Sequence, residues 1–212
     1  MTTDAATTSE LVLDAVLPDF DETIVAHVVV DAPPPVVFTA VRNMDFLEIH
    51  SPVMDAAMFL RGLPALIGSW FRRAPAPPAP QSFTLADFYS GSDDESVLAG
   101  WVPLGETPPH EIAFGAAGKV WQPEIEWRRV EPADFAAFAE PGFAKIAASF
   151  SMRPYGRTRT LLSYEARTAN TDPASRKRFK RYWFLVRIFV GVILKAAVRT
   201  AKDLAETADS AS

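Results

Sequence analysis

The stretch Asp172–Glu206 limits the possible folds most, because its residues follow the periodicity of one long amphipathic helix. Asp172 and Pro173 predict its start, since aspartate caps free N–H groups and proline suits the first helical position. Beyond them, apolar residues recur every three or four positions and therefore share one wide face. These residues are Phe179, Tyr182, Trp183, Val186, Phe189, Val190, Ile193, Ala197, Val198, Ala201 and Leu204. A helix of this length spans about 50 Å and needs a large apolar partner.

Short strands upstream can supply that partner. The β-branched run Thr23–Val30, which is followed by three prolines, predicts a first strand and then a short helix over Val36–Arg42. Turn-forming residues separate further strand candidates, a spacing that suits an antiparallel meander. The candidates are Ser82–Tyr89, Ser96–Val102, Glu111–Ala116 and Val120–Arg129. A helical turn is predicted in Glu131–Phe138, followed by a hairpin of two longer strands, Phe143–Met152 and Thr158–Thr168. The sequence therefore predicts an α+β fold whose sheet packs on the long helix.

The chain is long enough to form one core, because it has 212 residues of which 49% are hydrophobic. We expect a single domain over 21–206, with disordered tails at 1–20 and 207–212 that have no sustained hydrophobic period. Within the domain, apolar spacing over Asp45–Ile67 predicts two short helices or a helical lid. The proline-rich segment Arg72–Gln81 predicts an exposed extended loop.

Composition disfavours several classes of protein. The sequence has no cysteine, which excludes disulfides, thiolate metal sites and a cysteine nucleophile within this chain. Met1–Glu10 has no basic residue and no apolar run of leader length, so a cytoplasmic location is expected. The longest apolar stretch, Tyr182–Val198, contains Arg187 and Lys195, so stable insertion into a membrane is not expected.

The net charge of −5 hides a basic segment, because Asp172–Glu206 carries nine Lys or Arg residues against three acidic ones. This face is either a solvated outer surface or a surface that docks a partner, nucleic acid or an anionic membrane. We favour the solvated surface, since the rest of the protein is acidic and the helix has an apolar stripe to bury. Nucleic-acid binding is not expected, because the large aromatic residues elsewhere lack a basic sheet around them and predict core or pocket wall instead. These aromatic residues are Trp101, Phe114, Trp121, Trp127 and Phe150.

Four segments carry a resemblance to a known family. They are TIVAHVVVDAPPPVVFTAVR, LGETPPHEIAFGAAGKVWQP, FAEPGFAKIAASFSMRPYGRTRTLLSYEART and TDPASRKRFKRYW. In this order they resemble the START-like helix-grip superfamily (SRPBCC), and within it a bacterial group similar to polyketide cyclase/dehydrase proteins, over about Thr23–Lys202. The resemblance implies a curved antiparallel sheet wrapped around the C-terminal helix, with a cavity for an apolar ligand between them. It implies no particular reaction.

Catalytic chemistry has few candidates in this chain. The sequence lacks the glycine-rich and nucleophile motifs of kinases, dehydrogenases and hydrolases, and its histidines lack metal-ligand spacing, so no cofactor and no metal are expected. His50, which is close to Asp45 and Glu48, is the best acid/base candidate because histidine titrates near neutral pH. Arg153 and Tyr155 stand at a strand end, where a guanidinium and a phenol can hold a carboxylate or a ketide oxygen.

The predicted ligand-binding residues combine the lid, the sheet and the first half of the long helix. They are Phe46, His50, Met54, Met58, Trp121, Phe150, Tyr182, Trp183, Val186 and Phe189. The smaller side chains of Ala196–Ala205 are expected to pack on the sheet instead. Strand alternation alone leaves open whether Glu165 faces the cavity.

Three functions remain open at this point. In the first, a monomer or homodimer binds a lipid-like or polyketide-like hydrophobic small molecule in the cavity. In the second, an enzyme of cyclase, aromatase or dehydratase type uses the same pocket, with His50, Arg153 or Tyr155 polarising a ketide chain. In the third, the protein has no cavity and docks a partner or a membrane surface through its basic face.

Overall fold

The structure of the protein is a computed structural model that describes residues 11–46, 84–91 and 100–211. Its strands form one antiparallel sheet in the order β1-β6-β5-β3-β2, and β4 pairs with β3 beside this path. The strands are β1 (Glu22–Val30), β2 (Trp101–Thr107), β3 (Glu111–Gly118), β4 (Trp127–Arg128), β5 (Ala144–Tyr155) and β6 (Arg159–Asn170). The helices are α1 (Val12–Val16), α2 (Pro34–Asn43), α4 (Leu85–Ser90), the 3-10 turn η2 (Pro132–Asp134) and α5 (Pro173–Ser210).

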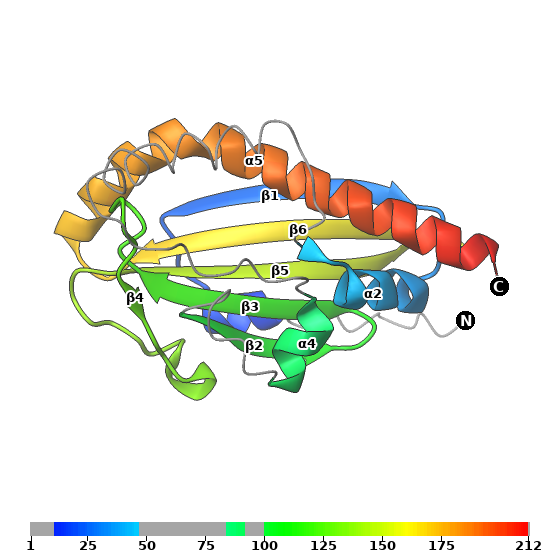
Figure 1. Cartoon of the computed structure of the whole chain (residues 1–212), viewed down its shortest axis with the longest axis horizontal. Helices are drawn as coiled ribbons and strands as arrows, with labels where there is room; N and C mark the ends of the chain where they lie inside the picture. Colours follow the sequence, from blue (N-terminus) through cyan, green and yellow to red (C-terminus); the bar gives the residue numbers. More distant parts are fainter. Residues whose placement is uncertain (1–10, 47–83, 92–99, 212) are drawn as a thin grey trace, which may run out of the picture.

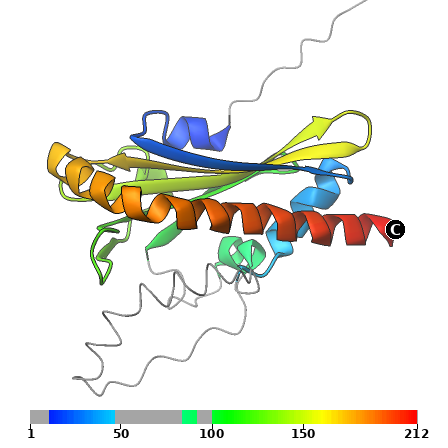
Figure 2. The same ribbon diagram turned by 90° about the horizontal axis from the view of Figure 1, so that it is seen from above.

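The long helix and the sheet have the predicted arrangement. In Figure 1, α5 runs across one face of the curved sheet, and Figure 2 shows α1 on the opposite face. The short helix α2 follows the first strand and lies on the same side as α5. An antiparallel sheet that curves around a long C-terminal helix is the helix-grip architecture, so the predicted α+β fold is confirmed.

Helix α5 begins where the sequence predicts. The carboxylate of Asp172 accepts hydrogen bonds from the N–H groups of Ala174 and Ser175, at 2.8 and 3.0 Å, and from the Ser175 hydroxyl. It also accepts from the N–H of Gly142 at 2.6 Å, which ties the helix start to the segment before β5. Because hydrogen bonds from Ser175, Gly142 and Ala174 favour the charged form, the pKa of Asp172 lies well below its ordinary value.

The end of α5 differs from the prediction. The helix continues past Glu206 to Ser210, so most of the expected C-terminal tail is helical. No glycine or proline stops it there, and the hydroxyls of Thr207 and Ser210 donate to the carbonyls of Asp203 and Glu206 at 2.7 Å. A hydroxyl that bonds to the carbonyl four residues earlier is compatible with helical backbone, so the helix can continue through these residues.

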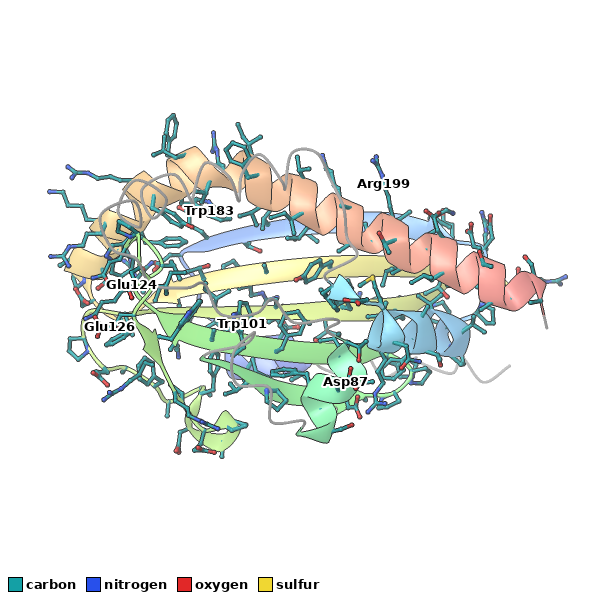
Figure 3. All side chains as sticks on the ribbon, viewed as in Figure 1. Asp87, Trp101, Glu124, Glu126, Trp183 and Arg199 are labelled. Carbon is teal, nitrogen blue, oxygen red and sulfur yellow. The ribbon has the colours of Figure 1, made fainter. Side chains whose placement is uncertain are left out.

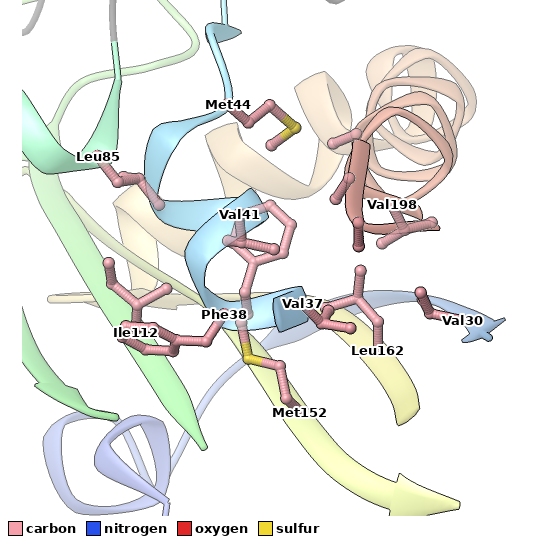
Figure 4. Packing of buried hydrophobic residues seen from close by; sticks show 14 of the residues in the cluster. Val30, Val37, Phe38, Val41, Met44, Leu85, Ile112, Met152, Leu162 and Val198 are labelled. Atoms are coloured by element: carbon pink, nitrogen blue, oxygen red, sulfur yellow. The ribbon is translucent and has the colours of Figure 1, made fainter. Parts of the chain in front are cut away.

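The second half of α5 packs on the sheet and on α2. Its small buried residues join one hydrophobic cluster with the inward side chains of β1, β5 and β6. This agrees with the expectation that Ala196–Ala205 packs on the sheet. Figure 4 shows Val198 of α5 facing Val37 of α2 and Leu162 of β6. Close packing of this kind fixes the C-terminal half of the helix against the sheet.

The other face of the sheet carries a second cluster, which the sequence did not predict. Residues 11–17, expected to belong to a disordered tail, contain α1, and the side chain of Leu13 is 0% exposed. Leu13 and Leu17 pack there with apolar residues of β2, β3 and β5 and of the segment around η2. The cluster members are Leu13, Leu17, Val102, Ala117, Val130, Phe135 and Ala147.

Three strand predictions were wrong in type or extent. Ser82–Tyr89 overlaps helix α4, because Thr84 caps the N–H of Asp87 at 3.1 Å and Gly91, at φ +72°, ends the helix. Strand β2 begins only at Trp101 and continues past Pro103 through a register shift, instead of ending at Val102. Of Val120–Arg129, only Trp127 and Arg128 pair with β3. The predicted loop at Arg72–Gln81 lies outside the described residues, as does the predicted lid beyond Phe46.

A buried carboxylate holds α1 on the sheet. Glu111 at the start of β3 is 2% exposed and accepts hydrogen bonds from the N–H groups of Val12, at 2.6 Å, and Leu13, at 3.3 Å. Burial raises the pKa of Glu111, while hydrogen bonds from Val12, Leu13 and Ser149 oppose the rise. The folded protein therefore binds the proton of Glu111 more tightly than the unfolded chain does.

Replacing Glu111 by glutamine is expected to change how stability depends on pH. The contribution of protonated Glu111 is fully present below the ordinary pKa of 4.5 and is lost as pH rises through the raised pKa. Since glutamine cannot ionise, the free energy of unfolding of the wild type should fall relative to that of Glu111→Gln as pH rises through this range. Urea unfolding of both proteins at a series of pH values measures the difference, and parallel curves would contradict the prediction.

Candidate functional site

A partly enclosed groove lies between the first half of α5, the sheet and the segment before β4. Its volume is about 300 Å³, at the lower end of the range for small-molecule sites. The groove is lined by Trp101, Val120, Ile125, Trp127, Ile146, Ala166, Thr168, Phe179, Tyr182, Trp183, Val186 and Val190. The groove therefore lies between the sheet and the C-terminal helix.

Helix α5 supplies one wall because its periodicity turns a row of large side chains toward the sheet. Phe179, Tyr182, Trp183, Val186 and Val190 follow one another at steps of one, three or four residues. The rings of Phe179 and Trp183 stack with centroids 5.7 Å apart. These aromatic rings give the wall a rigid apolar surface.

The sheet supplies the floor. Ile146 of β5 and Thr168 of β6 are register partners, and Ala166, two residues before Thr168, lies on the same face of the sheet. The small side chain of Ala166 leaves room above the strand. Figure 3 shows Trp101 on β2 and Trp183 on α5, which line the groove from the sheet and from the helix.

Glycines let Trp127 lie flat beside the groove. A Cβ atom on Gly118 would stand 2.7 Å from Cε3 of Trp127, and one on Gly100 would stand 2.6 Å from its Cβ, so neither position tolerates a side chain without movement. Trp127 in turn contacts Trp101, with ring centroids 6.3 Å apart. The two glycines therefore allow a pair of tryptophans to form the end of the groove nearest β4.

The groove is apolar in chemistry. Its polar side-chain groups are the hydroxyls of Thr168 and Tyr182 and the indole N–H groups of its tryptophans. Among the described lining residues there is no Asp, Glu, His, Lys or Arg. In the described ranges, no group of three or more His, Asp and Glu residues is arranged to hold a metal ion. Such a lining selects ligands by shape, apolar contact and a few hydrogen bonds.

An aromatic cluster continues from the groove into the core. Trp101 contacts Phe114, with ring centroids 5.6 Å apart, and Phe150 stacks on Tyr164 at 4.0 Å. Phe46 meets the ring of Phe150 edge-on at 6.1 Å. Burial raises the pKa of Tyr164. The phenol therefore stays neutral at physiological pH.

The structure separates the predicted ligand-binding residues into groups. Tyr182, Trp183 and Val186 line the groove, whereas Phe46 and Phe150 belong to the neighbouring aromatic cluster. Trp121 and Phe189 are partly exposed and are not part of the lining. His50, Met54 and Met58 lie outside the described residues. The three groove residues share one face of α5, which is why helical periodicity picked them out together.

The structure does not bring Arg153 and Tyr155 to the groove. Arg153 is seven residues beyond Ile146 on β5, about 24 Å along the strand, and strand alternation turns it toward the opposite face. Tyr155 is 46% exposed, and the guanidinium of Arg159 lies over its ring at 5.0 Å. Both side chains belong to the far end of the β5–β6 hairpin.

The open question about Glu165 has an answer in the structure. Because Ala166 and Thr168 line the groove, Glu165 and Arg167 point to the other face of β6. There Arg167 Nε donates to Glu165 at 2.7 Å, and Arg167 Nη2 donates to Asp14 of α1 at 2.7 Å. This ion pair anchors α1 and has no contact with the groove.

Sequence reasoning missed the floor of the groove. Ile146, Ala166 and Thr168 are ordinary strand residues, and nothing in their types distinguishes a cavity floor from a packed core. The only available signal was the alternation along β6, which groups Tyr164, Ala166 and Thr168 on one face. Trp101 and Trp127 were expected in core or pocket wall, and both line the groove.

Comparisons with known proteins add little beyond this geometry. No family model matches the chain, and no curated protein sequence matches it. Protein MLL2253 from Mesorhizobium loti is 14% identical with a TM-score of 0.37, covering 89% of this chain and 99% of its own. The di-domain ARO/CYC protein BexL is 14% identical with a TM-score of 0.35, covering 90% of this chain and 50% of its own. The Zhui aromatase/cyclase from a Streptomyces species is 10% identical with a TM-score of 0.28, covering 87% of this chain and 93% of its own.

At TM-scores this low, the matches carry no argument about this chain. The fold class rests on the chain's own strand order and on the helix that the sheet encloses, which together define a helix-grip protein with an apolar groove. None of the described helices is long and apolar enough to cross a bilayer.

Proposed function

We propose that the protein binds a hydrophobic small molecule in the groove between α5 and the sheet. The observation that supports this is the lining, which is built from aromatic and aliphatic side chains with a few hydrogen-bonding groups at its edges. Water in such a groove makes few hydrogen bonds, so an apolar ligand that displaces it gains free energy. A lipid-like or polyketide-like molecule has this chemistry.

Binding is favoured over cyclase, aromatase or dehydratase catalysis by the side chains in the groove. Acid/base catalysis needs a group that exchanges protons near neutral pH within hydrogen-bond reach of the substrate. No described lining residue is of such a type. Of the three predicted catalytic residues, Arg153 and Tyr155 lie at the other end of β5, and His50 lies outside the described residues. The groove can hold a ligand by contact without any of these groups.

Two substitutions with opposite effects on groove volume test the proposal. Trp183→Ala removes part of the wall, and Ala166→Phe fills the floor, so each should weaken binding of the neutral probe Nile red by at least about tenfold. The matched control is Phe184→Ala, which removes an aromatic ring from the next position on α5 but from its outer, 67% exposed face. Fluorescence titration gives the dissociation constants of the wild type and the three variants.

The outcomes are distinct. Loss of affinity in both groove variants, with the control unchanged, supports the proposal. Wild-type protein that fails to bind Nile red, or a control that loses as much affinity as the groove variants, would overturn it. Native mass spectrometry of protein purified from its own host then looks for the molecule retained in the groove.

A further inference from the structure

The outer face of α5 exposes large apolar side chains that the fold does not use. Phe184, Leu185 and Ile188 are 67%, 68% and 69% exposed, the three highest values among the large hydrophobic residues that the structure describes. They stand together within little more than one helical turn, opposite the groove wall formed by Trp183 and Val186. Exposed large hydrophobic residues that cluster in this way mark an interaction surface.

Basic side chains surround this apolar patch. Pro173–Lys202 contains nine Lys or Arg residues and no acidic residue. Arg176 pairs with Asp21, and Lys202 pairs with Glu206. The other cations are exposed and have no ion-pair partner within the described part of the chain. They are Lys177, Arg178, Lys180, Arg181, Arg187, Lys195 and Arg199.

The cations and the apolar residues share the outward side of the helix. Lys177, Arg181, Phe184 and Ile188 follow one another at steps of three or four residues, so they form one stripe. Arg187 lies beside this stripe, with its guanidinium 5.6 Å from the centre of the Phe184 ring. Figure 3 shows Arg199, further along α5, pointing away from the sheet. Clustered Lys and Arg residues are attracted to an anionic lipid surface, and large apolar side chains beside them can enter its interface.

We propose that the outer face of α5 docks the protein peripherally on an anionic lipid surface. Phe184, Leu185 and Ile188 enter the boundary between headgroups and acyl chains, while the unpaired cations contact lipid phosphates. The negative potential of such a surface attracts each exposed Lys or Arg, and the apolar side chains leave water on contact. Charge complementarity therefore selects the occupant of this face.

A second copy of the chain fits the same face poorly. A two-fold contact pairs a surface with itself, so Lys177, Arg181 and Lys195 of one molecule would lie against the same basic stripe of the other. Like charges placed together across an interface oppose association. No Asp or Glu residue occurs between Pro173 and Lys202 to offset this repulsion.

Docking through this face would also place the groove beside the lipid. Residues on different sides of the same helical turn, such as Val186 and Ile188, then face the groove and the membrane respectively. This last point rests on the proposed ligand-binding function, whereas docking itself does not. A variant of the outer face should therefore lose vesicle binding and keep Nile red binding.

Vesicle co-sedimentation of the full chain tests the inference. The probes are vesicles of phosphatidylcholine alone and vesicles in which about a third of the lipid is phosphatidylglycerol. The wild type is expected to bind the anionic vesicles and not the neutral ones, and to bind less at high salt because the attraction is screened.

The triple variant Phe184→Ser, Leu185→Ser, Ile188→Ser should bind at least about tenfold more weakly. The variant Lys177→Gln, Arg181→Gln, Lys195→Gln should lose about fivefold per cation.

Leu204→Ser is the matched control, because Leu204 is a 45% exposed apolar residue near the other end of α5. It should leave vesicle binding unchanged. Absence of wild-type binding to anionic vesicles, or equal binding to neutral ones, would overturn the inference. So would retention of full binding by the triple serine variant, since simple attraction to a polyanion needs no apolar insertion. Light scattering that shows a wild-type dimer and a monomeric triple variant would assign the face to a second copy instead.

Discussion

Phe150→Ala is expected to lower the free energy of unfolding by about 3–5 kcal/mol, the usual cost of emptying a core phenylalanine site. Phe150 is 0% exposed, stacks on Tyr164 at 4.0 Å and contacts Phe114 and Phe46. Its neighbours come from β3, β6 and the end of the segment after α2, so they cannot all move in to fill the space. Urea unfolding followed by tryptophan fluorescence measures the loss.

Phe189→Ala provides the comparison for Phe150. Both phenylalanines were predicted to bind ligand from the sequence, but Phe189 is only partly buried on α5 and should cost about 1 kcal/mol or less. If Phe150→Ala leaves stability unchanged and removes Nile red binding, Phe150 is a cavity wall and not a core residue. That result would contradict a place for Phe150 in the core.

Arg167→Ala is expected to cost about 2–3 kcal/mol and to release α1 from the sheet. The guanidinium of Arg167 holds the Asp14 carboxylate at 2.7 Å and also donates to the carbonyls of Leu13, at 3.4 Å, and Leu17, at 3.2 Å. Its removal takes this donor from the Leu17 carbonyl, whereas the Leu13 carbonyl still accepts from the N–H of Leu17 at 3.0 Å. We place the cost below that of a fully buried ion pair because the Asp14 carboxylate is partly exposed.

The measurement combines urea unfolding with amide hydrogen exchange of residues 12–17, which should accelerate more than exchange in β5. Arg153→Ala serves as the control, since Arg153 is an exposed arginine on the neighbouring strand, and its change should stay within about 0.5 kcal/mol. Arg167→Lys should recover only part of the loss because lysine cannot contact two carboxylates with one planar group. Equal losses in Arg153→Ala and Arg167→Ala would contradict the anchoring role.

Elements with strong local signals were predictable from the sequence. Helix α5 combines a cap, a proline at the right position and many turns of amphipathic periodicity, so both its start and its inner face were predicted. The long strands β5 and β6 also have enough β-branched and apolar residues to be recognised. In a long helix or strand, many residues carry the same signal, so one atypical residue does not change the prediction.

Elements held by distant contacts were not predictable in this way. Helix α1 has five residues and depends on Glu111, which follows Val12 by 99 positions, and on Arg167, which follows Asp14 by 153. A pattern of neighbouring residues in the sequence cannot predict contacts with residues so far along the chain. The groove floor was missed for a related reason, since Ala166 and Thr168 define a cavity only through what stands above them. The helix wall, by contrast, was visible because one periodic segment supplies it.

Through its contacts, α1 covers the face of the sheet opposite α5. Leu13 and Leu17 cover Val102, Phe135 and Ala147, which would otherwise face solvent. A protease that cut between Leu17 and Glu22 would separate α1 from the sheet and expose an apolar surface on the rest of the domain. Residues 11–17 therefore shield apolar surface of the sheet from solvent, although their composition is that of a dispensable segment.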